Sequence, residues 1–190
     1  MTADPSFSEI LSAASTGWCQ RNWNEGVLSL ALPLQRVDPL SQLHLLAEKE
    51  NFRFLWDSSP GLSFAAAGQC QQLDLEGPRR FELAQKFSDA TFTRLIDTTP
   101  QVPQIARPRI LLAFSFFENT AERQRELYIP TATAPAVQSI LPRWQLSRQG
   151  RHGWLRLNGI STDQADAREL AEQLWLMREK LNKQEINFKE

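Results

Sequence analysis

The chain has 190 residues, enough for one domain with a substantial core but short for two. Hydrophobic residues make up 42% and charged residues 23%, as in ordinary globular proteins, and the net charge of −1 argues against binding nucleic acid or anionic membranes through overall charge. No apolar run approaches the ~18 residues of a membrane helix, and the first residues do not read as a signal peptide. Cys19 and Cys70 lie far apart, which favours neither a disulfide nor a metal site. We therefore expect a cytoplasmic protein.

Residues 1–26 are interpreted as an N-terminal extension that packs on a sheet. Phe7, Ile10 and Leu11 have the spacing of a short helix. Trp18 and Trp23 are expected to cover the neighbouring sheet, since tryptophans near a terminus are more often buried than functional.

The first strand and the first internal helix are predicted from residues 27–47. Alternation predicts a strand over residues 27–34, ended by Pro33. Asp38 as N-cap and Pro39 in the first turn then predict a helix start. The apolar stripe of this helix comprises Leu40, Leu43, Leu46 and Ala47.

Residues 52–95 predict three strands followed by a helix. Aromatic residues alternate with polar ones before the turn signal Pro60-Gly61, and a small apolar strand then ends at Gly68. Residues 69–76 form the third strand, and Pro78 opens the helix. Its predicted apolar face comprises Phe81, Ala84, Phe87 or Ser88, Thr91 and Leu95.

The middle of the chain contains a proline-rich segment and a strongly apolar strand. Residues 98–108 carry three prolines without periodicity, which predicts an exposed loop. Residues 109–117 are the most continuous apolar strand, and we expect it to be central to the sheet. A charged excursion follows at residues 118–126.

The last third predicts a hairpin and a long helix. Strands at residues 137–148 and 153–158 are joined by a turn containing Gly150. The helix runs from Thr162 or Asp163, with an apolar stripe of Ala167, Leu170, Leu174, Met177 and Leu181. Trp175 and Leu176 widen this stripe, so the helix either exposes an apolar patch or packs on its own sheet with only Trp175 half exposed.

These elements and their residues resemble the amino-terminal half of chorismate-utilising enzymes, most closely isochorismate synthases of the cyanobacterial kind. The likeness rests on the strand pair from Phe52 to Gly68, on Asp38-Pro39-Leu40, and on Ile140-Leu141-Pro142-Arg143-Trp144. Leu111, Leu112 and Ala113 depart from it, because relatives carry glycines before the matching "FSF" strand. The resemblance implies an α+β fold with a largely antiparallel sheet flanked by helices. It divides the chain into the extension 1–26, an α+β domain at 27–160, and a C-terminal amphipathic helix at 161–190 that leads to an absent catalytic half.

The resemblance also implies where the chemistry lies. Conversion of chorismate to isochorismate needs a lysine base, a glutamate acid and carboxylate-bound Mg²⁺. In the family all of these belong to the carboxy-terminal half. We therefore assign no catalytic, cofactor-binding or metal residue here, and Mg²⁺ and chorismate are expected only in the complete enzyme. The expected partner is the catalytic half, in cis or in trans, and the absence of an "LLES"-type motif gives no support for feedback regulation.

A scan of the residues themselves finds no catalytic motif. No GxGxxG, Walker, HExxH or GxSxG pattern is present. His44 and His152 are interpreted as boundary and turn residues, and Asp57 and Glu76 as strand ends. The remaining candidates, Lys180, Lys183, Glu185 and Lys189, fall on or beside the last helix and in no catalytic strand.

The alternative is a free-standing interaction domain or a single-stranded nucleic-acid-binding domain. Four arginines and two tryptophans on the hairpin have the composition of a stacking and phosphate-binding surface: Arg143, Arg148, Arg151, Arg156, Trp144 and Trp154. The competing interpretation places the tryptophans in the core and the arginines in solvent. The near-zero net charge disfavours nucleic acid as a partner.

Overall fold

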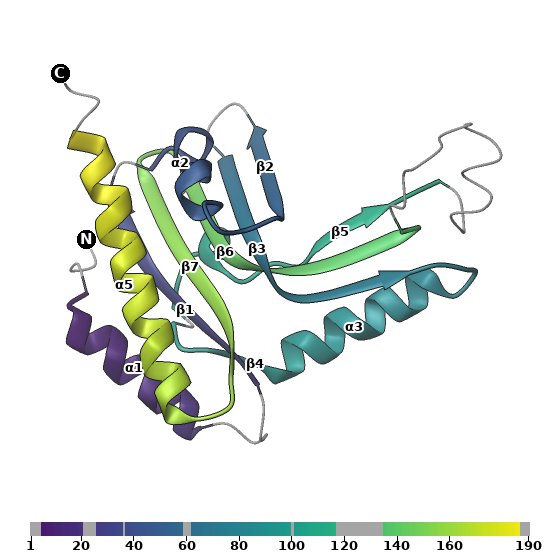
Figure 1. The fold of residues 1–190 in the computed structure, drawn as a ribbon, viewed down its shortest axis with the longest axis horizontal. Coiled ribbons are helices and arrows are strands. Elements are labelled where there is room, and N and C mark those ends of the chain that lie inside the picture. Colours follow the sequence, from purple (N-terminus) through teal and green to yellow (C-terminus); the bar gives the residue numbers. More distant parts are fainter. Residues whose placement is uncertain are drawn as a thin grey trace.

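The computed structural model describes residues 5–20, 26–35, 37–58, 62–99, 101–116 and 135–186, without the side chains of 184–186. Trp23, Lys189, the Pro60-Gly61 turn and the charged excursion at 118–126 lie outside the described residues. The elements in chain order (Figure 1) are α1 (Phe7–Cys19), β1 (Gly26–Gln35), α2 (Pro39–Leu46), β2 (Arg53–Ser58), β3 (Leu62–Leu75), α3 (Arg80–Arg94), β4 (Leu95–Asp97), the 3₁₀ turn η1 (Gln104–Ala106), β5 (Leu111–Phe114), β6 (Val137–Gln149), β7 (His152–Ser161) and α5 (Gln164–Ile186).

In the described part of the chain the strands form one sheet in the order β2-β3-β6-β7-β1-β4, with β5 paired to β6. Every pairing is antiparallel except the short parallel one between β1 and β4. The predicted α+β class with a largely antiparallel sheet flanked by helices is therefore confirmed. No helix in the described ranges is long and apolar enough to cross a membrane.

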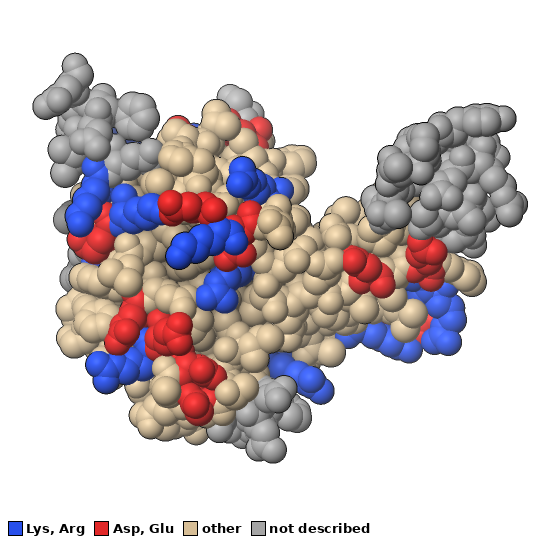
Figure 2. Space-filling view, viewed as in Figure 1, with Lys and Arg blue, Asp and Glu red and all other residues tan. Residues whose placement is uncertain are grey.

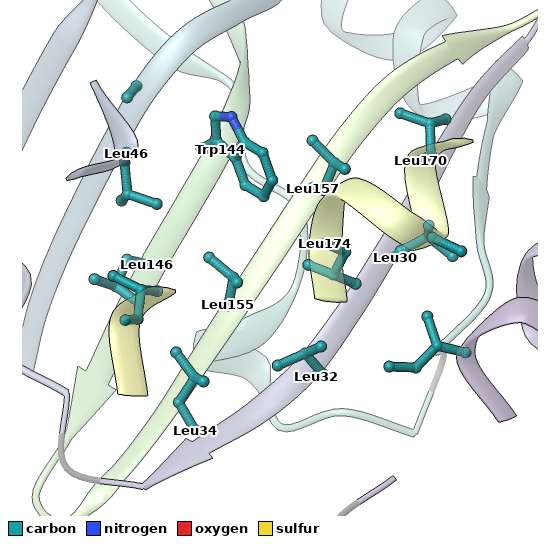
Figure 3. Packing of buried hydrophobic residues seen from close by; sticks show 14 of the residues in the cluster. Leu30, Leu32, Leu34, Leu46, Trp144, Leu146, Leu155, Leu157, Leu170 and Leu174 are labelled. Carbon is teal, nitrogen blue, oxygen red and sulfur yellow. The ribbon is translucent and has the colours of Figure 1, made fainter. Parts of the chain in front are cut away.

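One face of the sheet is covered by α1, α2 and α5 and contains the main core (Figure 3). Leucines alternate along β1 and β7, so one side of each strand faces the helices. Each fully buried leucine contributes roughly 1.5–3 kcal/mol relative to an exposed one. The labelled core residues are Leu30, Leu32, Leu34, Leu46, Trp144, Leu146, Leu155, Leu157, Leu170 and Leu174.

The last helix, α5, packs on its own sheet. Leu170, Leu174 and Leu181 are buried in the core. Trp175 is partly buried, and its ring centroid lies 5.7 Å from that of Phe7 in α1. The more exposed neighbour is Leu176 rather than Trp175, because Leu176 lies on the outer side of the helix.

The opposite face of the sheet is covered by α3 and by the segment that contains η1. The prediction of an exposed loop at residues 98–108 is wrong, because Val102, Ile105 and Ala106 are buried. Val102 and Ala106 pack with Ala31 of β1 and Trp154 of β7. The prolines of this segment interrupt regular structure but do not prevent a few apolar residues from packing on the sheet.

Residues 62–75 form a single strand, β3, where the sequence predicted two strands broken at Gly68. The register against β6 shifts by one residue between Gln69 and Gln71, and Gly68 has φ of +68°. A glycine adopts this left-handed conformation without the steric cost that a Cβ carries. Gly68 therefore lies just before a β-bulge within the strand and does not end it.

The strand predicted to be central is at an edge. β5 spans only Leu111–Phe114 and pairs with β6 alone among the described strands. Leu112 and Phe114 are exposed. A continuous apolar run is typical of a strand buried on both sides, but among the described strands β5 has no second neighbour.

Smaller predictions were also corrected. β1 continues past Pro33, which the sheet tolerates because β4 pairs β1 only at residues 27–29 and leaves that edge open at the proline.

Leu40 is exposed and not part of the α2 stripe. Asp38 is the N-cap of α2, but its carboxylate makes no capping bond. Phe81 of α3 is exposed, and Leu95 begins β4.

The sheet has a body and an arm. Beyond the bulge, residues 69–75 of β3 and 137–142 of β6 continue away from the helices α1, α2 and α5, and β5 and α3 accompany them (Figure 1). We call these residues, with β5 and α3, the arm. α3 covers the side of the arm that carries Leu73, Leu75 and Ser139, and Thr91 of α3 donates a hydrogen bond to Gln71 (3.0 Å).

Candidate functional site

Two grooves of the described surface, of about 420 Å³ each, bring polar side chains together and are considered as candidate sites. The α2–α5 groove lies between α2, α5 and β6, and the α1–β1 groove lies between α1, β1 and the segment after β4. The α2–α5 groove is lined by Leu45, Leu46, Glu48, Lys49, Glu50, Arg143, Trp144, Gln173, Leu176, Met177 and Lys180. The α1–β1 groove is lined by Pro5, Glu9, Ile10, Ala13, Leu30, Ala31, Pro33, Thr98, Thr99, Gln101, Val102 and Trp154.

The α2–α5 groove brings a lysine and a glutamate together, the residue types required of a base and an acid. Lys180 of α5 donates a hydrogen bond to the Glu48 carboxylate. Glu48 is 64% and Lys180 37% exposed, so the pair lies in solvent. The hydrogen bond from Lys180 and its charge lower the pKa of Glu48. A general acid needs a raised carboxyl pKa, so this environment acts against that role.

Two further charges of the same groove, those of Arg143 and Glu50, lie close to one another. Arg143 donates to the Gln173 side-chain oxygen at 2.6 Å, and its Nε lies 3.7 Å from Glu50. Figure 2 shows basic and acidic side chains intermixed over α2 and α5. The groove therefore presents no concentrated charge to an anionic substrate.

The α1–β1 groove has an apolar wall and one carboxylate. Glu9 belongs to a capping box at the start of α1, where it accepts hydrogen bonds from the Ser6 amide (2.7 Å) and the Ser6 hydroxyl (2.8 Å). These bonds lower the pKa of Glu9. None of the described residues that line this groove is a lysine, arginine or histidine, so these residues offer no proton donor and acceptor pair for catalysis.

A buried ion pair joins the hairpin to the η1 face. The Arg156 guanidinium donates to Asp97 (3.0 and 3.3 Å), to the Ser29 hydroxyl (2.5 Å) and to the Ala106 carbonyl (2.6 Å). Burial lowers the pKa of Arg156, while the Asp97 charge opposes that shift. Ser29 in turn donates to Asn158 (2.6 Å). The network links β7, β1, β4 and η1, and its donors are occupied by protein acceptors, so we interpret it as structural.

Sequence reasoning missed this ion pair. Asp97 ends β4 and Arg156 lies within β7, 59 residues apart in the sequence. The available signal was an arginine inside a strand otherwise rich in buried residues, because such a charge requires a partner. Without the topology that partner was not identifiable.

The other candidate residues are not brought together. His44 Nδ1 lies 2.7 Å from the Ser41 carbonyl oxygen within α2, and His152 is exposed at the start of β7. Asp57 pairs with Ser63 at one end of β3, and Glu76 follows the other end. At about 3.3 Å per residue those ends are up to roughly 40 Å apart. Lys183 is exposed on α5, and the Glu185 side chain lies outside the described residues.

Neither cysteine forms a disulfide. Cys19 is exposed. Burial raises the pKa of the Cys70 thiol to about 12, so it is protonated at neutral pH and is not an activated nucleophile.

Among the described residues no group of three or more His, Cys, Asp or Glu side chains is placed to hold a metal ion. The carboxylates that line the two grooves already have partners: Glu48 pairs with Lys180, Glu50 with Arg143, and Glu9 with the Ser6 amide. This part of the chain therefore does not fit Mg²⁺, and no chemical step is assigned to a metal here.

The hairpin arginines do not form a nucleic-acid surface. Arg156 is buried and paired, Arg143 contacts Gln173 and Glu50, and Arg148 lies 3.6 Å from Asp38. Trp144 is buried in the core, as the competing interpretation expected, but the arginines are not simply solvated. Arg151 in the turn is exposed. A stacking and phosphate-binding stripe is therefore not favoured.

The chain resembles known proteins in two of three comparisons. A family model described as chorismate binding enzyme matches residues 10–190. Among solved structures, the menaquinone-specific isochorismate synthase MenF from Escherichia coli is similar at 17% identity and a TM-score of 0.44, with 90% of this chain and 34% of that chain covered. The chain thus spans about a third of the length of that structure. A search of curated proteins found no match.

Proposed function

Because the chain belongs to the family of chorismate binding enzymes, we propose that it is the non-catalytic, amino-terminal portion of an isochorismate synthase-like protein of the cyanobacterial kind. Its role is to complete the structure on which a catalytic portion folds. The catalytic portion, joined in cis or in trans, supplies the lysine base, the glutamate acid and the carboxylates that bind Mg²⁺. The product isochorismate then serves menaquinone or phylloquinone synthesis, and the free thiols support a reducing, cytoplasmic setting.

One observation carries this proposal. The family match extends over residues 10–190, yet the lysine and glutamate that the described grooves bring together are bonded to each other in solvent. A chorismate isomerisation site needs the acid protonated and the base free to accept a proton from water. The Lys180–Glu48 pair satisfies neither need, since its charges stabilise the ionised carboxylate.

The test is an assay of the purified chain with chorismate and Mg²⁺. We expect no isochorismate from the chain alone, and none or little from a separately expressed catalytic portion of the same genome. Mixing the two should restore turnover. The Lys180→Met variant is the matched control, because it removes the one groove lysine bonded to a glutamate and should leave the restored activity unchanged. Turnover by the chain alone, abolished in that variant, would contradict the proposal.

A further inference from the structure

The outer edge of β5 is an open hydrogen-bonding edge in the described part of the chain. The Ser115 amide donates to the Ala136 carbonyl (2.7 Å), which makes Ser115 and Ala136 a hydrogen-bonded pair of the antiparallel ladder. Such pairs alternate, so the backbone groups of Leu112 and Phe114 point away from β6. No described strand pairs with that side of β5.

The side chains of the same two residues are also uncovered. Leu112 is 47% and Phe114 52% exposed, and Phe81 of α3 is 50% exposed. The Phe81 and Phe114 ring centroids lie 5.3 Å apart, so the apolar surface continues from the strand onto the helix. The outer backbone edge of β5 and these exposed apolar side chains therefore lie at the same place on the arm.

This edge lacks the features that normally protect a free strand. Natural edge strands carry charged residues or prolines, which discourage pairing with another chain. From Ile110 to Phe116 the sequence contains neither. It instead has the composition of a strand with neighbours on both sides, which is why the sequence predicted a central strand.

We propose that the edge of β5 is a strand-addition site that binds an extended segment with apolar side chains at alternate positions. Backbone hydrogen bonds to Leu112 and Phe114 give the segment its register, and its apolar side chains pack on Leu112, Phe114 and Phe81. The proposal rests on the proposed function in one respect: the segment belongs to the catalytic portion. β5 then becomes an internal strand of the combined sheet.

The experiment mixes the chain with the separately expressed catalytic portion and measures amide hydrogen exchange by NMR. Strand addition predicts that the amides of Leu112 and Phe114 become at least 100-fold more protected in the complex. Ala113 already donates toward β6 and should change less. Packing of two surfaces without strand addition would leave the Leu112 and Phe114 amides unchanged and would overturn the proposal.

Variants provide the second measurement. Leu112→Lys/Phe114→Lys places two charges on the docking edge, and we expect at least a 100-fold loss of affinity for the catalytic portion. The matched control is Leu40→Lys/Leu176→Lys, which changes two leucines that are 60% and 67% exposed on the α2 and α5 side of the body. The control should bind like the unaltered chain. Equal affinity of both double variants would also overturn the proposal.

The two hypotheses fail differently. Restored turnover without amide protection at β5 leaves the proposed function standing and rejects strand addition. Absence of any complex or turnover rejects the proposed function. It also rejects the catalytic portion as the source of the segment that binds β5. If the Leu112 and Phe114 amides are protected in the chain alone at high concentration, the occupant is a second copy and the assignment to a catalytic portion is wrong.

Discussion

At the scale of single residues, the Arg156–Asp97 pair is the feature on which the η1 face depends most. Arg156 is almost fully buried, and its hydrogen bonds reach three other segments of the chain. A buried charge that loses its partner is strongly destabilising, whereas exposed ion pairs contribute little. The distinction gives a direct prediction.

Asp97→Ala should lower the free energy of unfolding by about 3 kcal/mol, because it leaves the Arg156 guanidinium buried without its counter-charge. Urea unfolding followed by tryptophan fluorescence measures the effect. Glu82→Ala is the control, since Glu82 pairs with Arg79 and Lys86 in solvent, and we expect little change. A small loss in Asp97→Ala would mean that water reaches the guanidinium.

At the scale of elements, the start of α5 depends on an acidic residue. Asp166 accepts hydrogen bonds from the Thr162 amide (2.7 Å), the Thr162 hydroxyl (2.7 Å) and the Asp163 amide (3.3 Å). The bonds from Thr162 lower the pKa of Asp166. Asp163 returns a bond by accepting from the Asp166 amide (2.8 Å), so the first turn is closed from both sides.

The lowered pKa of Asp166 fixes the sign of a pH dependence. A carboxyl group whose pKa is lower in the folded state stabilises the protein at pH values above its unfolded-state pKa. That stabilisation is lost as the pH falls through the folded-state pKa. Asp166→Asn should therefore be less stable than the unaltered chain at pH 7, and the gap should close below the usual range of aspartate. Urea unfolding at a series of pH values measures it. A gap that stays constant into strong acid would contradict the assignment.

Local sequence patterns predicted which helices and strands form better than they predicted which strands lie next to one another. The hairpin of β6 and β7 and the helix α5 follow from alternation, a glycine turn and a regular apolar stripe, all of which are local signals. β5 was misplaced because an apolar strand reads the same whether its second neighbour is present or absent. β3 was divided at Gly68 because a glycine in a strand signals a bulge as well as an end.

For the candidate site, the absence of catalytic residues stays a prediction. The motif scan and the family resemblance both indicated that no catalytic residue is assigned here. The Lys180–Glu48 contact was not foreseen, because it joins α5 to the end of α2 across 132 residues. The covering of Ala31 and Trp154 by Val102 and Ala106 was likewise hidden, since three prolines in that segment favoured a loop.

At the scale of the whole molecule, the arm and the body differ in how they are covered. The body strands β7 and β1 lie between neighbours and under three helices, whereas the arm has α3 on one side and, at β5, an edge with which no described strand pairs (Figure 1). Regions with few buried apolar contacts open at lower free energy than the core. The arm should therefore open without global unfolding.

Hydrogen exchange followed by mass spectrometry tests this expectation. Peptides from β5 and α3 should exchange at least ten times faster than peptides from β1 and β7 under native conditions. Adding low urea should accelerate the β1 and β7 peptides more, because their exchange requires the larger unfolding. Identical rates and urea dependences in arm and body would show one cooperative unit.

The bulge in β3 also keeps the two regions in phase. Ala67 lies opposite Trp144 before the shift and Gln71 opposite Leu141 after it, so β3 carries one residue more than β6 across the junction. With that additional residue Leu73 and Leu75 lie beneath α3, while Gln72 and Asp74 remain in water. The same residues paired with β6 as a regular strand without the bulge would turn the two leucines to the other side of the sheet and the polar pair towards α3, inverting the arm while leaving the body intact.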